Sequence, residues 1–311
     1  MKRYIAKRIV YLVLTLFIIT TATFFLMKNL PGTPFDEEKL ALLTQDQRDQ
    51  IYASYGLDKP VIVQYVNYIG NIVQGDLGTS IYYTGQDVKD IIVDRIYPSA
   101  LVGLQAILLG TVIGLILGVL AAYRHNSGWD YAAMIVSVLG VSIPNFVLAA
   151  LLQYYIGLKW GILPVAFWES YDSSVLPSVA LSFGVIAIIA RFVRTEMLEV
   201  LQQDYIVTAK AKGLGQMAIL SRHAVRNSLI PVITILGPIV VNLLTGSLVI
   251  ENIFGIPGIG SLFVDSIKTN DYATIMGVTI FYSAFYVVVM LLVDILYSLV
   301  DPRIRLGSGR E

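Results

Sequence analysis

The chain has 311 residues and a mean hydropathy of +0.71, with 56% hydrophobic and 14% charged residues. Soluble domains carry about 25% charged residues, so this composition indicates a membrane protein. Lys plus Arg and Asp plus Glu both number 22, and a net charge of zero gives no indication of a nucleic-acid partner. The absence of cysteine excludes disulfides, thiolate metal sites and cysteine nucleophiles. Since His125 and His223 lie far apart in the sequence, we expect no metal site.

Long uncharged stretches predict the membrane spans. A helix needs about 18 or more mainly apolar residues to cross the hydrocarbon layer, which is about 30 Å thick. Six stretches reach this length: residues 9–26, 99–123, 131–158, 173–190, 227–250 and 272–293, the last of which continues past Asp294 to residue 300. The sequence therefore predicts an all-α polytopic membrane protein with six transmembrane helices.

Lys and Arg gather in the segments that lie on the same side as the N-terminus in a six-span arrangement, and most acidic residues lie in the other segments. Basic residues mark the cytoplasmic side of a membrane protein. Both termini are therefore expected in the cytoplasm.

Residues 1–27 are expected to form the first transmembrane helix, residues 28–97 an extracytoplasmic helical cap, and residues 98–311 the transporter core. Within the cap, Thr44 is a candidate N-cap before a short helix that ends near Gly56. A second helix is expected after Pro60, followed by a turn at "QGDLGTSI". The sequence leaves open whether this cap contacts a ligand.

Small and polar residues occur inside the expected spans. Gly110, Gly114 and Gly118 recur every fourth residue, a spacing that lets a second helix approach closely. The amides of Asn145, Gln153 and Asn242 could line a substrate path or form hydrogen bonds between helices, and both interpretations stay open.

Asp294 is an acidic residue in the last expected span, and Arg191 and Arg194 lie at a similar depth on the fourth. A paired charge costs less inside a membrane than a lone one. We therefore expect a structural ion pair here. A proton relay is the alternative, although it would need a chain of acids across the membrane.

Motifs of the common catalytic sites are absent. The sequence has no G-x-x-x-x-G-K-[ST] phosphate loop, no G-x-S-x-G elbow and no H-E-x-x-H helix. We expect no catalytic residues and no cofactor bound by this chain.

Residues 194–226 form a long cytoplasmic connection after the fourth span. "DYIVTAKAKGLG" continues the preceding helical pattern until Gly213 and Gly215 interrupt it, and a second short amphipathic helix follows. Small residues beside a glycine turn could press into a groove of another protein. The lysines would equally suit a helix lying on anionic lipid, so the residues alone leave both possibilities open.

The same segment, followed by "RHAVRNSLIPV", resembles the coupling "EAA" loop of ATP-binding-cassette importer permeases. Val207, Thr208 and Ala209 stand where that motif has Glu, Ala and Ala, a departure usual in the peptide branch. Further segments are similar to the B-type permease subunit of oligopeptide, dipeptide and nickel importers: "KRYIAKRIVYL", "LPGTP", "YGLDKPVIVQY", "GDLGTS", "SIPNF", "LTGSLVIENIFGIPGIG", "DYATIMG" and "LVDILYSLVDPRIRL".

The resemblance implies a noncatalytic permease in a bacterial or archaeal cell membrane. Its implied partners are a second, C-type permease, two ATPase subunits that use ATP and Mg, an extracytoplasmic solute-binding protein and a peptide substrate. The implied ATPase-coupling residues are Asp204, Tyr205, Thr208, Ala209, Lys210, Ala211, Lys212, Gly213, Leu214 and Gly215. An oligopeptide importer is the main interpretation; a dipeptide or nickel importer, a stand-alone secondary transporter and a membrane-bound enzyme are the alternatives.

Overall fold

The computed structural model describes residues 2–29, 33, 35, 40–220 and 224–300, without the side chains of residues 2–8, 216, 230 and 294–300. In this part of the chain the secondary structure is helical, apart from an isolated bridge between Thr79 and Asp87. Five helices are long and apolar enough to cross a membrane, or up to seven spans if two bent pairs each count as one. The all-α membrane fold is confirmed, and the count of six spans stays a prediction.

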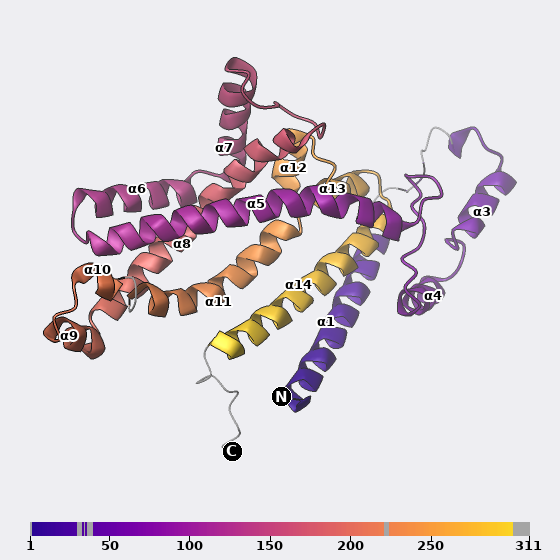
Figure 1. Cartoon of the computed structure of the whole chain (residues 1–311). Coiled ribbons are helices and arrows are strands. Elements are labelled where there is room, and N and C mark those ends of the chain that lie inside the picture. The colour runs from indigo at the N-terminus through magenta and orange to yellow at the C-terminus, as the bar shows by residue number, and fades with distance from the viewer. Residues whose placement is uncertain (1, 30–32, 34, 36–39, 221–223, 301–311) are drawn as a thin grey trace. The chain divides into compact units, whose positions relative to one another are not determined.

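The chain divides into two compact units. Unit 1 comprises Met1–Tyr97 and Gly258–Val287, and unit 2 comprises Pro98–Pro257 and Val288–Glu311. Two long helices, α5 (Val88–Tyr123) and α14 (Tyr272–Val300), which are labelled in Figure 1, contribute residues to both units.

Unit 1 also contains α1 (Lys2–Lys28), α3 (Gln45–Ser54), α4 (Val61–Val73) and α13 (Ile259–Lys268). The two predicted cap helices are confirmed as α3 and α4. Thr44 caps α3 in a capping box with Gln47, since each side chain bonds the other residue's backbone N–H. The cap is tied to α1 because the hydroxyls of Thr21 and Tyr65 lie 2.7 Å apart and the Phe24 ring contacts the Tyr65 ring.

The "GDLGTS" turn of the cap is anchored on the start of α14. Asp271 is only 1% exposed, and its carboxylate accepts hydrogen bonds from the hydroxyls of Ser80 at 2.5 Å and Thr274 at 2.7 Å. A buried carboxylate is stable only when such donors replace water. Asp271 and Ser80 lie 191 residues apart in sequence, so this hydrogen bond joins two distant segments of unit 1.

Unit 2 is built around α8 (Val175–Leu201), whose apolar stretch is 72% buried. The glycine ladder of α5 faces this helix. A Cβ added at Gly110 would lie 2.4 Å from the Cβ of Val185, and one at Gly114 would lie 2.8 Å from that of Ile189. The ladder therefore permits close packing of α5 and α8 within this chain, as the spacing predicts.

The third expected span, residues 131–158, is not one straight helix. It divides into α6 (Gly128–Ser142) and a segment made of α7 (Asn145–Leu152) and the π-helix η1 (Gln153–Lys159), bent by 99° (Figure 1). Pro144 cannot donate a backbone hydrogen bond and forces the preceding residue out of the helical region. Ile143 accordingly has φ −83° and ψ 118°.

The fifth expected span, residues 227–250, is also interrupted. The helix α11 runs from Val225 to Leu244, and α12 (Leu248–Phe254) begins after a break that contains Gly246 at φ +90°. Glycine adopts this left-handed backbone without the steric penalty of a side chain. By contrast, Pro231 and Pro238 lie inside α11 without ending it.

Candidate functional site

The predicted coupling segment forms two short helices, α9 (Asp204–Ala211) and α10 (Gln216–Ile219), at the end of α8 that lies away from α12 (Figure 1). The backbone of Gln203 is extended, at φ −73° and ψ 148°, and separates α8 from α9. Asp204 then occupies the first turn of α9, where a negative charge stabilises the helix dipole. The segment is therefore a separate structural element and not a simple continuation of α8.

One face of α9 packs against the rest of the segment. Ile206 is fully buried, Ala209 is 8% exposed and Ile219 is 3% exposed, and all three belong to one apolar cluster with Leu201 and Leu214 at its edge. Ala209, which the resemblance places among the coupling residues, thus faces inward. Its contribution in this chain is to join α9 to α10.

The opposite face of α9 is exposed. Val207 is 59% exposed and Tyr205 is 42% exposed, which are high values for residues with large apolar surfaces. The exposed residues on this face and in the following turn are Asp204, Tyr205, Val207, Thr208, Lys210, Ala211, Lys212, Gly213 and Gly215. Leu214 is only half-buried, at the edge of the inner cluster.

Gly213 ends α9 in a left-handed conformation, with φ +80°. Its N–H donates to the carbonyl of Lys210 at 2.9 Å, and the N–H of Leu214 donates to the carbonyl of Ala209 at 3.2 Å. These two bonds form a Schellman motif, which prefers glycine at the left-handed position. Gly213 therefore has a backbone conformation that is unfavourable for other residues.

A second contact fixes the segment to the core of unit 2. The amide nitrogen of Asn227, near the start of α11, donates to the hydroxyl of Tyr205 at 2.9 Å. The segment is therefore connected to α8 along the chain and to α11 both along the chain and through this hydrogen bond. The sequence places Met217, Leu220 and Ala224 on one face of the second short helix. Leu220 and Ala224 are buried whereas Met217 is 66% exposed, so this prediction is only partly confirmed.

An ion pair that the sequence analysis missed joins α6 to α8. The Arg194 guanidinium contacts both carboxylate oxygens of Asp130, at 2.6 and 2.8 Å. The ring of His125 lies 3.1 Å from the same carboxylate, and the Asn126 N–H donates to it at 3.0 Å. The Asp130 side chain is 3% exposed. Depth in the membrane makes Asp130 a candidate partner of Arg194, but it does not distinguish Asp130 from Asp294.

The structure does not describe the Asp294 side chain. The pairing of Asp294 with Arg191 or Arg194 therefore stays a prediction. Arg191 is exposed, whereas Arg194 binds Asp130.

The three amides proposed for a substrate path occupy separate positions. Gln153 donates to the carbonyls of Val165 at 2.8 Å and Ile253 at 3.0 Å, so it fixes a loop and α12 to η1. The amide of Asn145 lies beside Gly184 of α8, and Asn242 is exposed on α11. No hydrogen bond between any two of these amides occurs within the described residues.

Glu251 is a buried carboxylate in α12 that the sequence does not predict, because it directly follows the fifth expected span, residues 227–250. Glu251 is 2% exposed, and the hydroxyl of Ser99, which is 1% exposed, donates to it at 2.6 Å. This bond links α12 to α5 within unit 2. Over the part of the chain that the structure describes, no three His, Asp or Glu side chains lie close enough together to hold a metal ion.

Two family models match the sequence. Residues 114–306 match the model of the binding-protein-dependent transport system inner membrane component, and residues 1–102 match the model of the N-terminal region of such membrane components.

Similar proteins match over nearly the full length. The chain is 48% identical to the dipeptide transport system permease protein DppB of Bacillus subtilis, over 98% of this chain and 99% of that protein. It is 46% identical to DppB of Lactococcus lactis and 40% identical to the oligopeptide transport system permease protein OppB of Haemophilus influenzae, in both cases over 98% of this chain and 100% of the relative.

The fold is similar to that of solved transporter chains. A chain of the MetNI methionine ABC transporter in an inward-facing conformation gives a TM-score of 0.56 at 19% identity, covering 68% of this chain and 96% of that one. A chain of an amino acid ABC transporter gives a TM-score of 0.51 at 16% identity, covering 70% of this chain and 95% of that one.

Proposed function

Because this chain belongs to the family of binding-protein-dependent transport system inner membrane components, we propose that it is a noncatalytic permease subunit of an ATP-driven importer of short peptides. The observation that carries this proposal is the full-length similarity to proteins named as dipeptide and oligopeptide permeases. Dipeptides and oligopeptides are both short chains of amino acids, and we propose an oligopeptide as the main substrate.

The importer would contain a second, C-type permease, two ATPase subunits and an extracytoplasmic solute-binding protein. The two permeases would enclose the peptide path between them. ATP and Mg would bind to the ATPase subunits. This chain would lie in the bacterial cell membrane with the coupling segment in the cytoplasm and the α3–α4 cap outside.

The exposed face of α9 suits a role in coupling. Tyr205 and Val207 offer apolar surface to a partner, and Lys210 and Lys212 offer charge beside it. An ATPase can shift the conformation of the permease only if it binds the two conformations with different affinity. The cluster of Ile206, Ala209 and Ile219 would keep α9 and α10 together while the motion of the ATPase subunits is transmitted to α8 and α11.

The proposal is tested by reconstituting the four membrane-associated subunits in liposomes with the solute-binding protein outside and ATP inside. Uptake of a radiolabelled dipeptide, a radiolabelled pentapeptide and nickel ion is then compared. We expect peptide uptake that requires both ATP and the binding protein. Peptide uptake driven by an ion gradient without ATP would identify a secondary transporter, and uptake of nickel alone would identify the nickel branch.

A further inference from the structure

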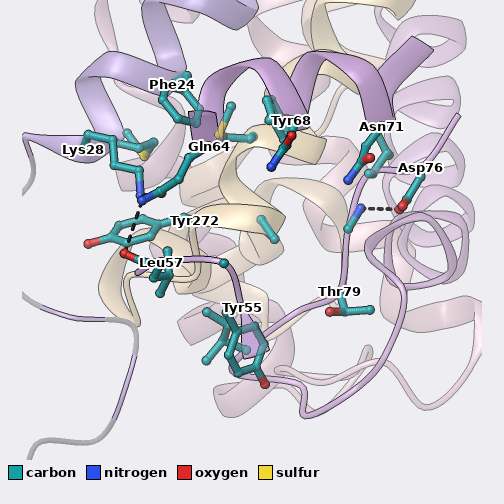
Figure 2. Close-up of a pocket in the computed structure, with 18 of the residues that line it drawn as sticks. Phe24, Lys28, Tyr55, Leu57, Gln64, Tyr68, Asn71, Asp76, Thr79 and Tyr272 are labelled. Carbon is teal, nitrogen blue, oxygen red and sulfur yellow. Dashed lines mark hydrogen bonds between the residues drawn. The ribbon is translucent and has the colours of Figure 1, made fainter. Parts of the chain in front are cut away.

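Unit 1 contains a cavity of about 480 Å³ that the proposed coupling does not use. This volume falls within the range of about 300–1,000 Å³ that is typical of small-molecule sites. The cavity is lined by the end of α1, one face of α4, the turn after α3, the "GDLGT" turn and the start of α14 (Figure 2). All of these segments belong to unit 1, so the cavity is complete within it.

Opposite charges lie at opposite ends of this cavity. Figure 2 shows Lys28 at one end and Asp76 at the other, with side chains of α4 between them. The Lys28 ammonium donates to the side-chain oxygen of Gln64 and lies 5.8 Å from the ring centres of both Phe24 and Tyr272. An ammonium has three donors, so donors are left for an anion.

Asp76 likewise keeps acceptor capacity. One of its carboxylate oxygens accepts the N–H of Gly78 at 2.8 Å, within the turn itself. An ionised carboxylate has about four acceptor positions. The turn therefore holds the carboxylate in place while leaving it able to bind a cation.

Between the two charges, α4 presents a row of polar groups. Gln64, Asn67 and Asn71 are spaced three and four residues apart, so they share one face of the helix, and all three line the cavity. Amide side chains can donate to a peptide carbonyl and accept from a peptide N–H.

The hydroxyl of Tyr68, in the same row, is buried and has no hydrogen-bond partner among the described residues. Burial raises the pKa of the Tyr68 phenol above its usual value, so the group stays a neutral donor. Buried polar groups without a partner are uncommon and call for an explanation such as an absent ligand or water.

We propose that this cavity binds a short peptide with free termini, whose carboxylate contacts Lys28 and whose ammonium contacts Asp76. The peptide backbone would bond to Asn67, Asn71 and the Tyr68 hydroxyl. Its side chains would contact the apolar part of the lining, formed by Phe24, Met27, Leu57, Leu77 and Met276. The proposal rests on the proposed function for the class of ligand and adds a second site for that ligand, in the cap.

A zwitterion fits this arrangement better than a ligand with a single charge. An anion such as a phosphate group would use Lys28 and place a like charge near Asp76 or leave it unused. A purely apolar molecule would displace water from Lys28, Asp76, Asn67 and Asn71 without replacing its hydrogen bonds, which costs free energy in a partly buried site. A peptide has a cation, an anion and backbone hydrogen-bonding groups between them.

The test uses the assembled permease and ATPase complex in lipid nanodiscs, without the solute-binding protein. Binding of the tripeptide Ala-Phe-Ala is measured by saturation-transfer NMR, beside the N-acetylated and the C-amidated tripeptide. We expect the free tripeptide to bind and each capped form to bind at least about 10-fold more weakly, because each cap removes one charge contact worth about 1.4 kcal/mol or more.

Single substitutions test which residue binds each terminus of the peptide. Lys28→Gln should remove the preference for the free carboxylate over the amide and keep the preference for the free amine, whereas Asp76→Asn should do the reverse. Lys89→Gln and Asp94→Asn remove the same charges from exposed positions of unit 1 outside the cavity, and they should bind as the unmodified chain does. Tyr68→Phe should weaken binding several-fold.

The outcomes separate this site from the proposed function, because uptake is measured in parallel with the solute-binding protein present. Two outcomes would overturn the proposed peptide site and leave the proposed importer function intact. One is normal uptake without tripeptide binding, and the other is normal uptake with equal binding of the free and capped tripeptides. A phospholipid retained in the cavity, detected by native mass spectrometry and lost in Lys28→Gln, would also overturn the site. Charge-dependent binding in a complex that imports no peptide would support the site and overturn the function.

Discussion

At the scale of single residues, Gly213 is the position where backbone geometry is most closely tied to the proposed coupling. Its φ of +80° lies in the left-handed region, and a Cβ built on it would meet nothing within 4 Å. A substitution therefore causes backbone strain and changes the exposed surface without a clash inside the chain. The strain is about 1–2 kcal/mol for an ordinary residue and less for asparagine.

We expect Gly213→Val to lose most ATPase retention and peptide uptake, because valine is branched at Cβ and opposes this conformation. Gly213→Asn should keep more of both, since asparagine tolerates the left-handed region. Co-purification of the ATPase subunits and peptide uptake are measured for both variants, with membrane yield as the control. Equal behaviour of the two variants would mean that the backbone conformation of Gly213 is unimportant for docking.

The second prediction at this scale concerns Asp130 and Arg194. Asp130→Asn should lower the thermal stability of the purified complex, since hydrogen bonds between charged groups contribute about 1.5–3 kcal/mol. The double variant Asp130→Asn with Arg194→Gln should recover part of the loss, because no unpaired charge remains.

The parallel cycle with Asp294→Asn and Arg191→Gln tests the pairing predicted from the sequence. A coupling energy between Asp294 and Arg191 would support that pairing. If Asp294→Asn instead assembles normally and only stops transport, a relay or substrate role replaces it. For Asp130 and Arg194, additive effects of the two substitutions would contradict the pair seen in the structure.

At the scale of elements, packing of α5 on α8 depends on the glycine ladder. Gly110→Ala should destabilise the protein by about 1–3 kcal/mol, the usual cost of overpacking, because the new Cβ would lie 2.4 Å from the Cβ of Val185. Gly128→Ala is the matched control, since its Cβ would meet nothing within 4 Å. Thermal unfolding in detergent checks the pair, and equal stability of the two variants would mean that α5 and α8 are not closely packed.

Elements with local signals could be predicted from the sequence. Thr44 and Gln47 lie three residues apart, as a capping box requires, and α3 begins there. Gly213 follows a helical pattern, and α9 ends two residues before it, at Ala211. In each case the determining contacts lie within a few residues of one another, so the amino-acid pattern contains them.

Other features depend on contacts or directions that the pattern does not contain. The hydrophobic run through Pro144 is uninterrupted, so its length predicts one span. The length of the run does not predict the 99° bend between α6 and α7. Asp271 gives no local indication that Ser80 is its partner. The same limit applies to Asp130, whose partner Arg194 lies on α8.

At the scale of the whole molecule, the distribution of Lys and Arg predicts the arrangement in the membrane. The chain contains no cysteine, so single cysteines can report each side of sealed vesicles. We expect cysteines at Asp58 and Asp172 to react with an impermeant reagent from outside, and one at Gly213 to react only after the membrane is opened. Labelling of position 213 from outside would exclude the arrangement with six spans.

The central claim is that the exposed face of α9 transmits ATP-driven motion, and a site-specific crosslink from this face tests it most directly. A photoreactive group on a cysteine at Lys212 is activated in the assembled importer, with and without ATP, beside a control at the buried position Ala224. The account predicts a crosslink from position 212 to an ATPase subunit, with a yield that changes when ATP binds. Crosslinks from position 212 to lipid alone, in a complex that still imports peptide, would contradict it.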